Sequence, residues 1–535
     1  MRIKPLNITL ICLLAIFALS ISLTPLRSDN DAWWHLKTGK ILADRGWKLP
    51  QNDVFAFTSE DIPWHNHEWL TEVLFFYFFQ MGDGTDQGGV RMVVIFKGAI
   101  LLLTSLLIFW FSFRETKSVP ISVLCAIWAM LLARRTVYPR PPIMSYLFFA
   151  GYLFLLRECF TGRISKRWLW VLPFAMIPWV NLHGGFILGI IAIGTYVSAD
   201  VIKDIIQRKS PFHRDMVMKA GLLFACILAS LVNPYTYRLY LLPGRVMTDV
   251  GLVRIIPELR SPDFFFTKSF EALLIFLIIV FAVMKKNILS LAEGFLLIFF
   301  LHQGIQHVRH VPLAGIVAAP VCARLFSSLQ EDYLPSRWKK AAFYGWSVLV
   351  IFLFFLTLMS RREGESFLDR NRNLLKGIGF YERNYPAPEA NFIIANQFTG
   401  RMYNQINDAG YLIWRLSPEH HKVFTDSRYD IFGGTFMRHE QIIQGGIDRK
   451  IYPQDKTWDE LLEFWNVNFI LITADAPVNP LLQDSGTWRL VYHRLPRYAK
   501  TTREGYKIYI RNIPENKDLI ERCLRSSRFV TPGAS

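Results

Sequence analysis

Long apolar runs separated by short polar segments fill the first 360 residues of this 535-residue chain. A helix needs about 20 apolar residues to cross the hydrocarbon core of a bilayer, and the runs approach or reach that length. The predicted fold class is therefore a polytopic α-helical membrane protein. We predict about eleven transmembrane helices, at residues 7–24, 90–112, 118–133, 142–157, 168–182, 185–202, 217–232, 269–284, 287–301, 311–327 and 341–359.

Basic residues mark alternate loops between these spans. If the N-terminus is cytoplasmic, every predicted inner loop is basic, as the positive-inside rule requires. An odd number of spans then places the C-terminal segment on the outer side of the membrane. The basic residues of the inner loops are Arg114, Lys117, Arg157, Arg163, Lys166, Arg167, Lys203, Arg208, Lys209, Arg214, Lys219, Lys285, Lys286, Arg337, Lys339 and Lys340.

One shorter apolar run tests this topology. Residues Trp69–Met81 (WLTEVLFFYFFQM) are too few to span a bilayer comfortably, and they include Glu72. We predict an interfacial or re-entrant helix here. If this helix spanned the bilayer instead, every later loop would change sides.

After residue 360 the long apolar runs end, and polar and apolar residues are mixed as in a soluble domain. We therefore divide the chain into a transmembrane domain, residues 1–360, and a soluble α/β domain, residues 361–535. A helix is predicted over Thr457–Trp465. Short β-type runs occur at residues 391–395, 411–414, 422–425, 469–473, 489–492 and 506–510.

Composition agrees with a membrane protein. Only 19% of the residues are charged, whereas soluble domains average about 25%. The net charge of +17 arises mostly in short loops, so it indicates topology rather than nucleic-acid binding. The six cysteines form no CxxC pair or disulfide framework. Arg2, Lys4 and the following apolar run resemble a signal peptide, but the small-x-small cleavage pattern is missing, so we predict an uncleaved first helix.

The best candidate for chemistry is the pair Asp29 and Asp31, at the start of a long first outer loop, residues 25–89. Acidic groups at a membrane boundary are costly unless they have a function. A carboxylate there can act as a general base. Two close carboxylates can instead bind a divalent cation such as Mg²⁺ or Mn²⁺. The plainer interpretation is a solvated cap at a helix end.

The rest of this loop is rich in histidine and tryptophan. His65, His67 and Glu68 are candidates to complete a metal site or to steer an acceptor, the alternative being ordinary interfacial polar residues. The loop also reads as a lid of amphipathic helices lying on the bilayer. Its membrane anchors would be Trp33, Trp34, Trp47, Trp64 and Trp69.

Arginines stand in the outer loops, against the charge rule that the inner loops obey. Arginine is suited to bidentate phosphate recognition, although such side chains also reach toward lipid headgroups. Outward arginines facing outward carboxylates suit a lipid-linked phosphate leaving group. His183, beside two glycines at the third outer turn, either faces the same cavity or belongs to a tight turn. The arginines are Arg134, Arg135, Arg140, Arg238, Arg260 and Arg309.

Several motifs together resemble bacterial membrane proteins of the GT-C glycosyltransferase superfamily. More distant relatives in this superfamily are the oligosaccharyltransferases, protein O-mannosyltransferases and aminoarabinose transferases. The resemblance covers nearly the whole chain. The motifs are Asp31-Ala-Trp-Trp-His-Leu-x-x-Gly39, His67-Glu-Trp-Leu70, Asn181-Leu-His-Gly-Gly185, Asn233-Pro-Tyr235 and Gly410-Tyr-Leu-Ile-Trp414 followed by Val423-Phe-Thr-Asp-Ser-Arg428.

This resemblance implies a function. Asp31 would be the catalytic base and Asp29 its neighbour or metal partner, while the outward arginines would hold the phosphate of a polyprenyl-phosphate sugar donor. The acceptor would be a glycan, lipid or protein, and nucleic acid is not an expected partner. The expected location is the bacterial inner membrane, with the N-terminus cytoplasmic and the C-terminal domain periplasmic.

The sequence also departs from better-known GT-C members. It lacks the WWD-type motif of oligosaccharyltransferases and the adjacent Asp-Glu of O-mannosyltransferases, so protein N-glycosylation is not supported. A metal requirement stays open, because some GT-C enzymes need none. Two other functions remain: a flippase for a lipid-linked saccharide, although no internal repeat is visible, and a non-catalytic scaffold subunit of GT-C fold.

Overall fold

The computed structural model describes residues 5–27, 29–208, 214–242, 244, 248–284, 289–359, 378–450, 456–494 and 505–527. The chain forms two compact units, and neither is one continuous segment. The first unit comprises Met1–Pro25, His67–Tyr240 and Ile256–Gly379. The second comprises Leu26–Asn66, Leu241–Ile255 and Phe380–Ser535. This grouping adds parts of two predicted outer loops to the C-terminal segment, whereas the predicted division placed a single boundary at residue 360.

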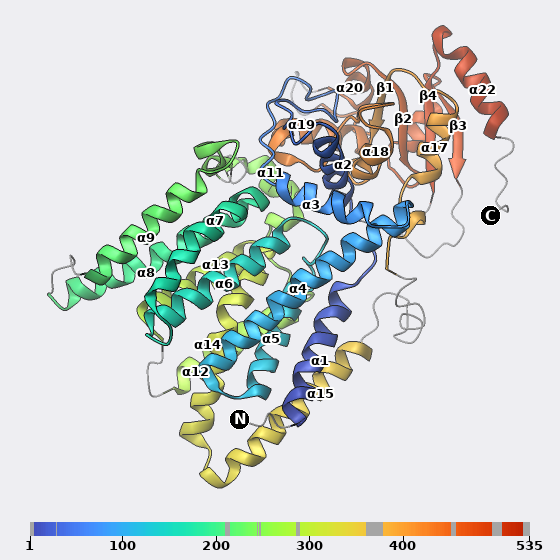
Figure 1. The fold of residues 1–535 in the computed structure, drawn as a ribbon. Coiled ribbons are helices and arrows are strands. Elements are labelled where there is room, and N and C mark those ends of the chain that lie inside the picture. Colours follow the sequence, from blue (N-terminus) through green and yellow to red (C-terminus); the bar gives the residue numbers. More distant parts are fainter. Residues whose placement is uncertain are drawn as a thin grey trace. The chain divides into compact units, whose positions relative to one another are not determined.

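The first unit is helical (Figure 1), and each of the eleven predicted spans coincides with a helix. The short run after Trp69 is also helical, as predicted. The helices are α1 (Pro5–Ser22), α3 (Trp69–Gln80), α4 (Asp86–Thr116), α5 (Val119–Ala133), α6 (Pro142–Phe160), α7 (Val171–Leu182), α8 (Ile187–Ile206), α9 (Arg214–Ser230), α12 (Lys268–Val283), α13 (Leu291–Gln306), α14 (Val311–Tyr333) and α15 (Lys339–Met359).

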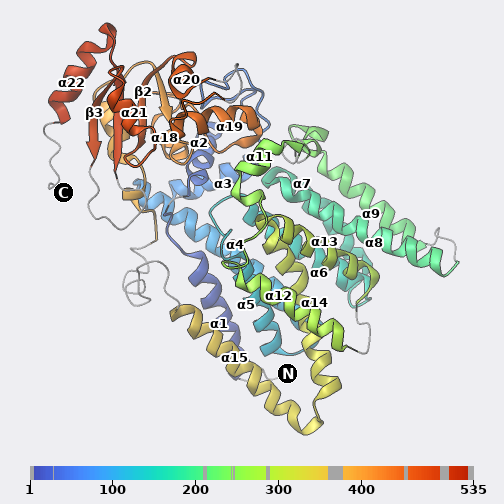
Figure 2. The ribbon, with the colours of Figure 1, turned by 180° about the vertical axis from the view of Figure 1, so that it is seen from behind.

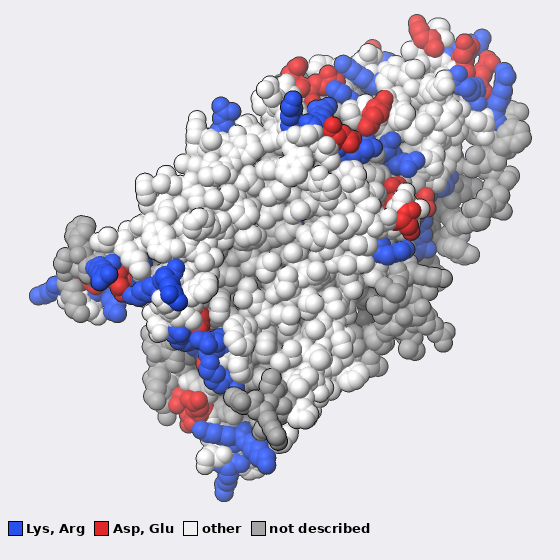
Figure 3. Space-filling view, viewed as in Figure 1, with Lys and Arg blue, Asp and Glu red and all other residues white. Residues whose placement is uncertain are grey.

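Six helical stretches among the described residues are long and apolar enough to cross a membrane. Two shorter apolar helices, α5 and α13, accompany them. A broad uncharged flank covers the helical part of the molecule in Figure 3, while lysines and arginines gather toward its ends. This pattern is typical of a membrane protein. Eleven spans and their orientation stay predictions. The six stretches are Pro5–Ser22, Asp86–Thr116, Pro142–Phe160, Gly184–Ile206, Val308–Tyr333 and Ser336–Phe355.

Small residues allow the central helices of this unit to approach closely. Helix α5 is buried along almost its whole length and packs against α1, α4 and α14. A Cβ atom on Gly315 of α14 would lie 2.8 Å from the Leu132 side chain and 3.4 Å from the Ala129 Cα atom. Glycine therefore allows the two helices to approach closely here, because a larger residue would force the Leu132 side chain to move.

A network of buried ion pairs joins the ends of α4, α6, α13 and α14. We refer to it as the Arg–Glu network. Three of its arginines were counted above as free charges of inner loops, but here they are paired with buried glutamates. Their positive charges therefore support the predicted topology less strongly than a count of basic residues implies. Of the other basic residues of the predicted inner loops, Lys209, Lys285 and Lys286 lie outside the described residues. The pairs are Arg114–Glu158 (2.5 Å), Arg157–Glu115 (3.3 Å), Arg157–Glu293 (3.0 Å), Arg163–Glu115 (2.7 Å), Arg163–Glu158 (2.7 Å), Arg324–Glu115 (3.2 Å) and Arg324–Glu293 (2.5 Å).

The second unit is built on a four-stranded mixed sheet with strand order β1-β2-β4-β3. Strands β1 and β2 are parallel, and the other two pairings are antiparallel. Helices α20, α21 and α22 pack against the sheet (Figure 2). Its elements are α2 (Asp31–Asp44), α11 (Val250–Ile255), α17 (Ala387–Ala395), β1 (Arg401–Asn404), α18 (Ala409–Leu416), α19 (Tyr429–Gly445), α20 (Trp458–Phe464), β2 (Val467–Thr473), α21 (Asn479–Asp484), β3 (Trp488–Arg494), β4 (Tyr506–Arg511) and α22 (Lys517–Ser527).

The predicted strands of this unit are partly correct. The last three predicted runs are strands β2, β3 and β4, and the predicted helix is α20. The runs at 391–395 and 411–414 were predicted wrongly, since they belong to helices α17 and α18. Most of α18 is buried, and a short buried apolar run has the same appearance in a helix and in a strand. The run at 422–425 is not a strand either, and its Val423 forms only an isolated bridge with Ala56.

The tryptophans of the first loop have a different role from the one predicted. Trp33 is fully buried, and its ring lies 4.8 Å from Phe380, 4.9 Å from Tyr411 and 5.5 Å from Tyr385, each edge to face. Trp34 and Trp64 are buried as well. These three residues are therefore core residues of the second unit and not membrane anchors. Among the loop's other tryptophans, Trp47 is 50% exposed.

Residues Leu241–Ile255 join this unit through Asp249. Its carboxylate accepts hydrogen bonds from the backbone N–H groups of Leu252 (3.1 Å) and Gly434 (2.9 Å). A Cβ atom on Gly434 would lie 2.6 Å from the same carboxylate, so glycine permits the close approach of α19. The hydrogen bonds lower the pKa of Asp249, because they favour its ionised form.

Candidate functional site

The two candidate carboxylates have different environments in the second unit. Asp29 is 3% exposed, and its Oδ1 accepts a hydrogen bond from the backbone N–H of Asp31 (3.2 Å). The hydroxyl of Tyr385 donates to the backbone carbonyl of Asp29 (3.2 Å). Asp31, by contrast, is the first residue of α2 and is only half-buried. Asp29 therefore shapes the turn into α2, whereas Asp31 is the more accessible of the two carboxylates.

Asn30, between the two carboxylates, fastens this turn to the C-terminal part of the chain. Its Nδ2 donates to the carbonyl of Ile406 (2.5 Å), and its Oδ1 accepts from the backbone N–H of Gly410 (2.7 Å). A Cβ atom on Gly410 would lie 1.8 Å from the Asn30 carbonyl oxygen. The chain therefore needs glycine at position 410, which explains why this residue begins one of the motifs noted above.

Asp31 is held by a second motif. The hydroxyl of Ser427 donates a hydrogen bond to Asp31 Oδ1. The indole N–H of Trp34, three residues along α2, donates to the same Ser427 oxygen (3.2 Å). An indole N–H can only donate, so the serine oxygen accepts that bond and directs its own hydrogen to Asp31. Asp31 and Ser427 belong to two of the sequence motifs, Asp31–Gly39 and Val423–Arg428, but the sequence did not indicate Ser427 as a site residue.

Arg428, next to Ser427, is a buried cation between two carboxylates. Its Nη2 lies 2.8 Å from Asp53 Oδ1 and 2.6 Å from Asp426 Oδ2. Its guanidinium also stacks on Phe55 (4.9 Å) and Trp64 (4.7 Å). Burial raises the pKa of Asp426, although Arg428 opposes the shift. Burial disfavours the charged form of Arg428 too, but the two carboxylates outweigh it and raise the pKa of Arg428. The sequence offered no signal for Asp53, because its partners lie far along the chain.

A second group of candidate residues lies in the first unit, around His183. The backbone N–H of Gly185 donates to His183 Nδ1 (2.9 Å), so Nδ1 carries no proton. Ser145 Oγ lies 2.7 Å from the same nitrogen and accepts from the Trp179 indole (2.8 Å). A neutral His183 must therefore carry its proton on Nε2, which lies 3.5 Å from Glu68 Oε1. Burial lowers the pKa of His183 to about 3, which keeps the ring neutral.

His67 completes this group from the other side of Glu68. Its Nε2 lies 3.6 Å from Glu68 Oε1. A Cβ atom on Gly184 would lie 3.1 Å from the His67 ring, so this glycine also keeps space for it. The structure thus brings His67, Glu68 and His183 together, and that His183 faces a substrate cavity stays a prediction. His65 belongs to the second unit.

The predicted phosphate-binding arginines differ from one another in their partners and in their exposure. Arg140 Nη1 is paired with Glu258 (2.9 Å), and the Arg135 guanidinium lies over the Phe266 ring (5.3 Å). Arg309 is exposed, and its charge acts on His183. The remaining residues of the set are Arg134, half-buried, and Arg238 and Arg260, both exposed.

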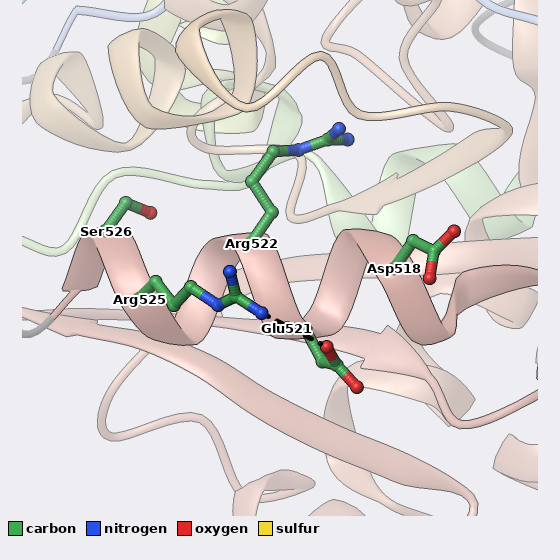
Figure 4. A pocket seen from close by; sticks show the side chains of 5 residues that line it. All are labelled: Asp518, Glu521, Arg522, Arg525 and Ser526. Carbon is green, nitrogen blue, oxygen red and sulfur yellow. Dashed lines mark hydrogen bonds and ion pairs between the residues drawn. The ribbon is translucent and has the colours of Figure 1, made fainter.

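The described residues contain no group of three or more His, Cys, Asp and Glu side chains arranged to hold a metal ion. A divalent cation at Asp29 and Asp31 therefore stays a prediction. The open hollow along α22 does not add a site (Figure 4). Its side chains project from one helix, Glu521 pairs with Arg525 at 3.5 Å, and none of the candidate residues lies there.

Neither a protein-family model nor a curated protein sequence matches the chain. A solved structure does: the crystal structure of the oligosaccharyltransferase of Archaeoglobus fulgidus, tethered with an acceptor peptide containing the NVT sequon. The alignment has a TM-score of 0.51 and 11% sequence identity, and it covers 88% of this chain and 69% of that one. The chain therefore shares the fold of this oligosaccharyltransferase over most of its length.

The same archaeal oligosaccharyltransferase, AglB, in complex with an inhibitory peptide and a dolichol-phosphate, aligns with a TM-score of 0.48 over the same shares of the two chains, a likeness too distant to add to the argument. At 11% identity, the similarity to the peptide-tethered oligosaccharyltransferase concerns the fold alone. Function therefore has to be argued from the side chains of this protein.

Proposed function

We propose that the protein is a GT-C-type membrane glycosyltransferase that transfers a sugar from a polyprenyl phosphate to an acceptor hydroxyl. The observation that carries this proposal is Asp31, a half-buried carboxylate held by Ser427 at the start of α2, in a chain of GT-C fold. The acceptor is a periplasmic glycan or protein, or a lipid-linked molecule, and the membrane is the bacterial inner membrane.

Asp31 acts as the general base. Its carboxylate takes the proton of the acceptor hydroxyl while the hydroxyl oxygen forms a bond to the anomeric carbon of the sugar. The bond between that carbon and the phosphate oxygen breaks, and its electron pair leaves with the polyprenyl phosphate. Since attack and departure occur on opposite faces, the configuration at the anomeric carbon inverts.

Asp29 supports this reaction through the backbone. Its Oδ1 is bonded to the Asp31 N–H, which fixes the first turn of α2. Among the described residues, no third His, Cys, Asp or Glu side chain is placed with Asp29 and Asp31 to hold a divalent cation, and the reaction is written with the protein's own groups. A metal requirement is a separate question, which transfer assays with and without Mg²⁺ or Mn²⁺ answer.

The departing phosphate carries negative charge that cationic side chains stabilise. Arg309 is the best candidate, because its side chain is exposed and its positive charge contributes to the lowered pKa of His183. Arg140 can contribute once the phosphate replaces Glu258 as its partner. Arg134, Arg135, Arg238 and Arg260 form the rest of the proposed set.

The test uses the purified full-length protein in liposomes with a radiolabelled polyprenyl-phosphate sugar and membrane extract as the source of acceptor. We expect the wild type to label an acceptor and Asp31→Asn to lower the rate by about 100-fold or more, the usual contribution of a general base. Asp29→Asn is the matched control and should retain more activity. Full transfer by Asp31→Asn would overturn the assignment of the base.

The same preparation distinguishes the two other functions. A flippase would move the labelled donor to the opposite leaflet without transferring its sugar. A scaffold subunit would do neither. Either outcome in the wild-type protein overturns the proposed transferase activity.

A further inference from the structure

We propose that Ser427 is a positioning residue that holds the Asp31 carboxylate in the orientation needed to accept a proton. The inference rests on the proposed function, in which Asp31 is the base. It assigns to the C-terminal part of the chain a role in the chemical step, beyond the presentation of an acceptor.

The direction of the hydrogen bonds supports this role. Trp34 donates to Ser427, and Ser427 donates to Asp31. The serine has a single hydrogen, and the indole N–H, which cannot accept, fixes which way that hydrogen points. The carboxylate is thereby held at Oδ1 by a donor whose own rotation is restricted. A half-buried carboxylate at the start of a helix would otherwise sample several rotamers.

The backbone on both sides of Ser427 is held by hydrogen bonds of buried side chains. Arg428 on one side is bonded to Asp53 and Asp426, and the Arg428 backbone N–H donates to Asp426 Oδ1 (2.8 Å). On the other side, Asn404 Nδ2 donates to the Thr425 carbonyl (3.1 Å). All of these flanking side chains are buried. A site supported in this way keeps its catalytic groups in place before the substrate arrives.

The test compares Ser427→Ala, Ser427→Thr and Trp34→Phe in the transfer assay. We expect Ser427→Ala to lower kcat about 10- to 100-fold with little change in the KM for the donor, because a misplaced base affects the reaction more than binding. Ser427→Thr keeps the hydroxyl and should retain most of kcat, since Ser427 is only half-buried. Trp34→Phe should lower kcat only a few-fold.

A double-mutant cycle separates positioning from a general structural role. If Trp34 acts through Ser427, the Trp34→Phe/Ser427→Ala variant should be no slower than Ser427→Ala alone. Two independent structural defects would instead multiply, and that result would overturn the proposal. Thermal unfolding of each variant identifies any that fail to fold, and Ser427→Thr keeps the test decisive if Ser427→Ala is unstable.

Failure of this inference differs from failure of the proposed function. If Asp31→Asn abolishes transfer but Ser427→Ala keeps the wild-type kcat, Asp31 remains the base and the positioning role is wrong. If Asp31→Asn retains full transfer, the base assignment is wrong, and the positioning role falls with it.

Discussion

Removal of the buried Arg428 cation should destabilise the second unit strongly. Arg428→Met leaves Asp53 and Asp426 facing each other in the core without a counter-charge. Loss of one partner from a buried ion pair costs about 3–5 kcal/mol. The substitution also removes the stacking of the guanidinium on Phe55 and Trp64. We therefore expect a loss at the upper end of that range, about 4–5 kcal/mol.

Thermal unfolding of the full-length protein in detergent measures this effect. In a domain of about 150–250 residues, each kcal/mol lowers Tm by about 2–4 °C, so the expected decrease is about 8–20 °C. Lys450→Met is the matched control, since it breaks an exposed pair with Glu460 (2.7 Å) that is worth less than about 1 kcal/mol. If Arg428→Met lowers Tm no more than this control, the buried triad is not a major source of stability.

Two further predictions concern the same unit. Burial raises the pKa of Glu440 to about 7, so the folded state binds its proton more tightly than the unfolded state. The stability of the unit therefore falls as pH rises from about 4.5 through 7. Glu440→Gln should make Tm less dependent on pH between 5 and 8 than in the wild type, and an unchanged dependence would contradict the assignment. A fragment of residues 380–535 lacks Trp33 and Asp53 and should show no cooperative unfolding by circular dichroism, whereas a fusion that adds residues 26–66 should regain it; a cooperative transition in the fragment alone would contradict the second unit as grouped here.

The helices of the first unit were predictable because each is a local apolar run of sufficient length. The strands were predictable only where they were long: β2 to β4 were found, but β1 (Arg401–Asn404) has four residues and no clear alternation. The short apolar runs within α17 and α18 carry no periodicity that separates a helix from a strand. Pattern alone therefore fails where an element is short and fully buried.

The candidate site was predictable in part. Position at a membrane boundary was enough to select Asp29 and Asp31, but only the hydrogen bonds of each carboxylate distinguish their roles. The contribution of Ser427 could not be derived, since it depends on contact between residues 396 positions apart. The burial of Trp33 also depends on residues far along the chain. From sequence alone, a tryptophan next to an apolar helix cannot be assigned to a membrane interface or to a protein core.

The Arg–Glu network also bears on how the chain is made. Glu115 and Glu158 are synthesised well before Arg324. Arg114, Arg157 and Arg163 are already available at that stage, and Arg163 is only 48 residues from Glu115. Each early glutamate therefore has an arginine partner from the same part of the chain, and it does not have to wait for Arg324 as an isolated buried charge. Glu293 and Arg324 then join as a pair, so the order of synthesis and the order of charge neutralisation agree.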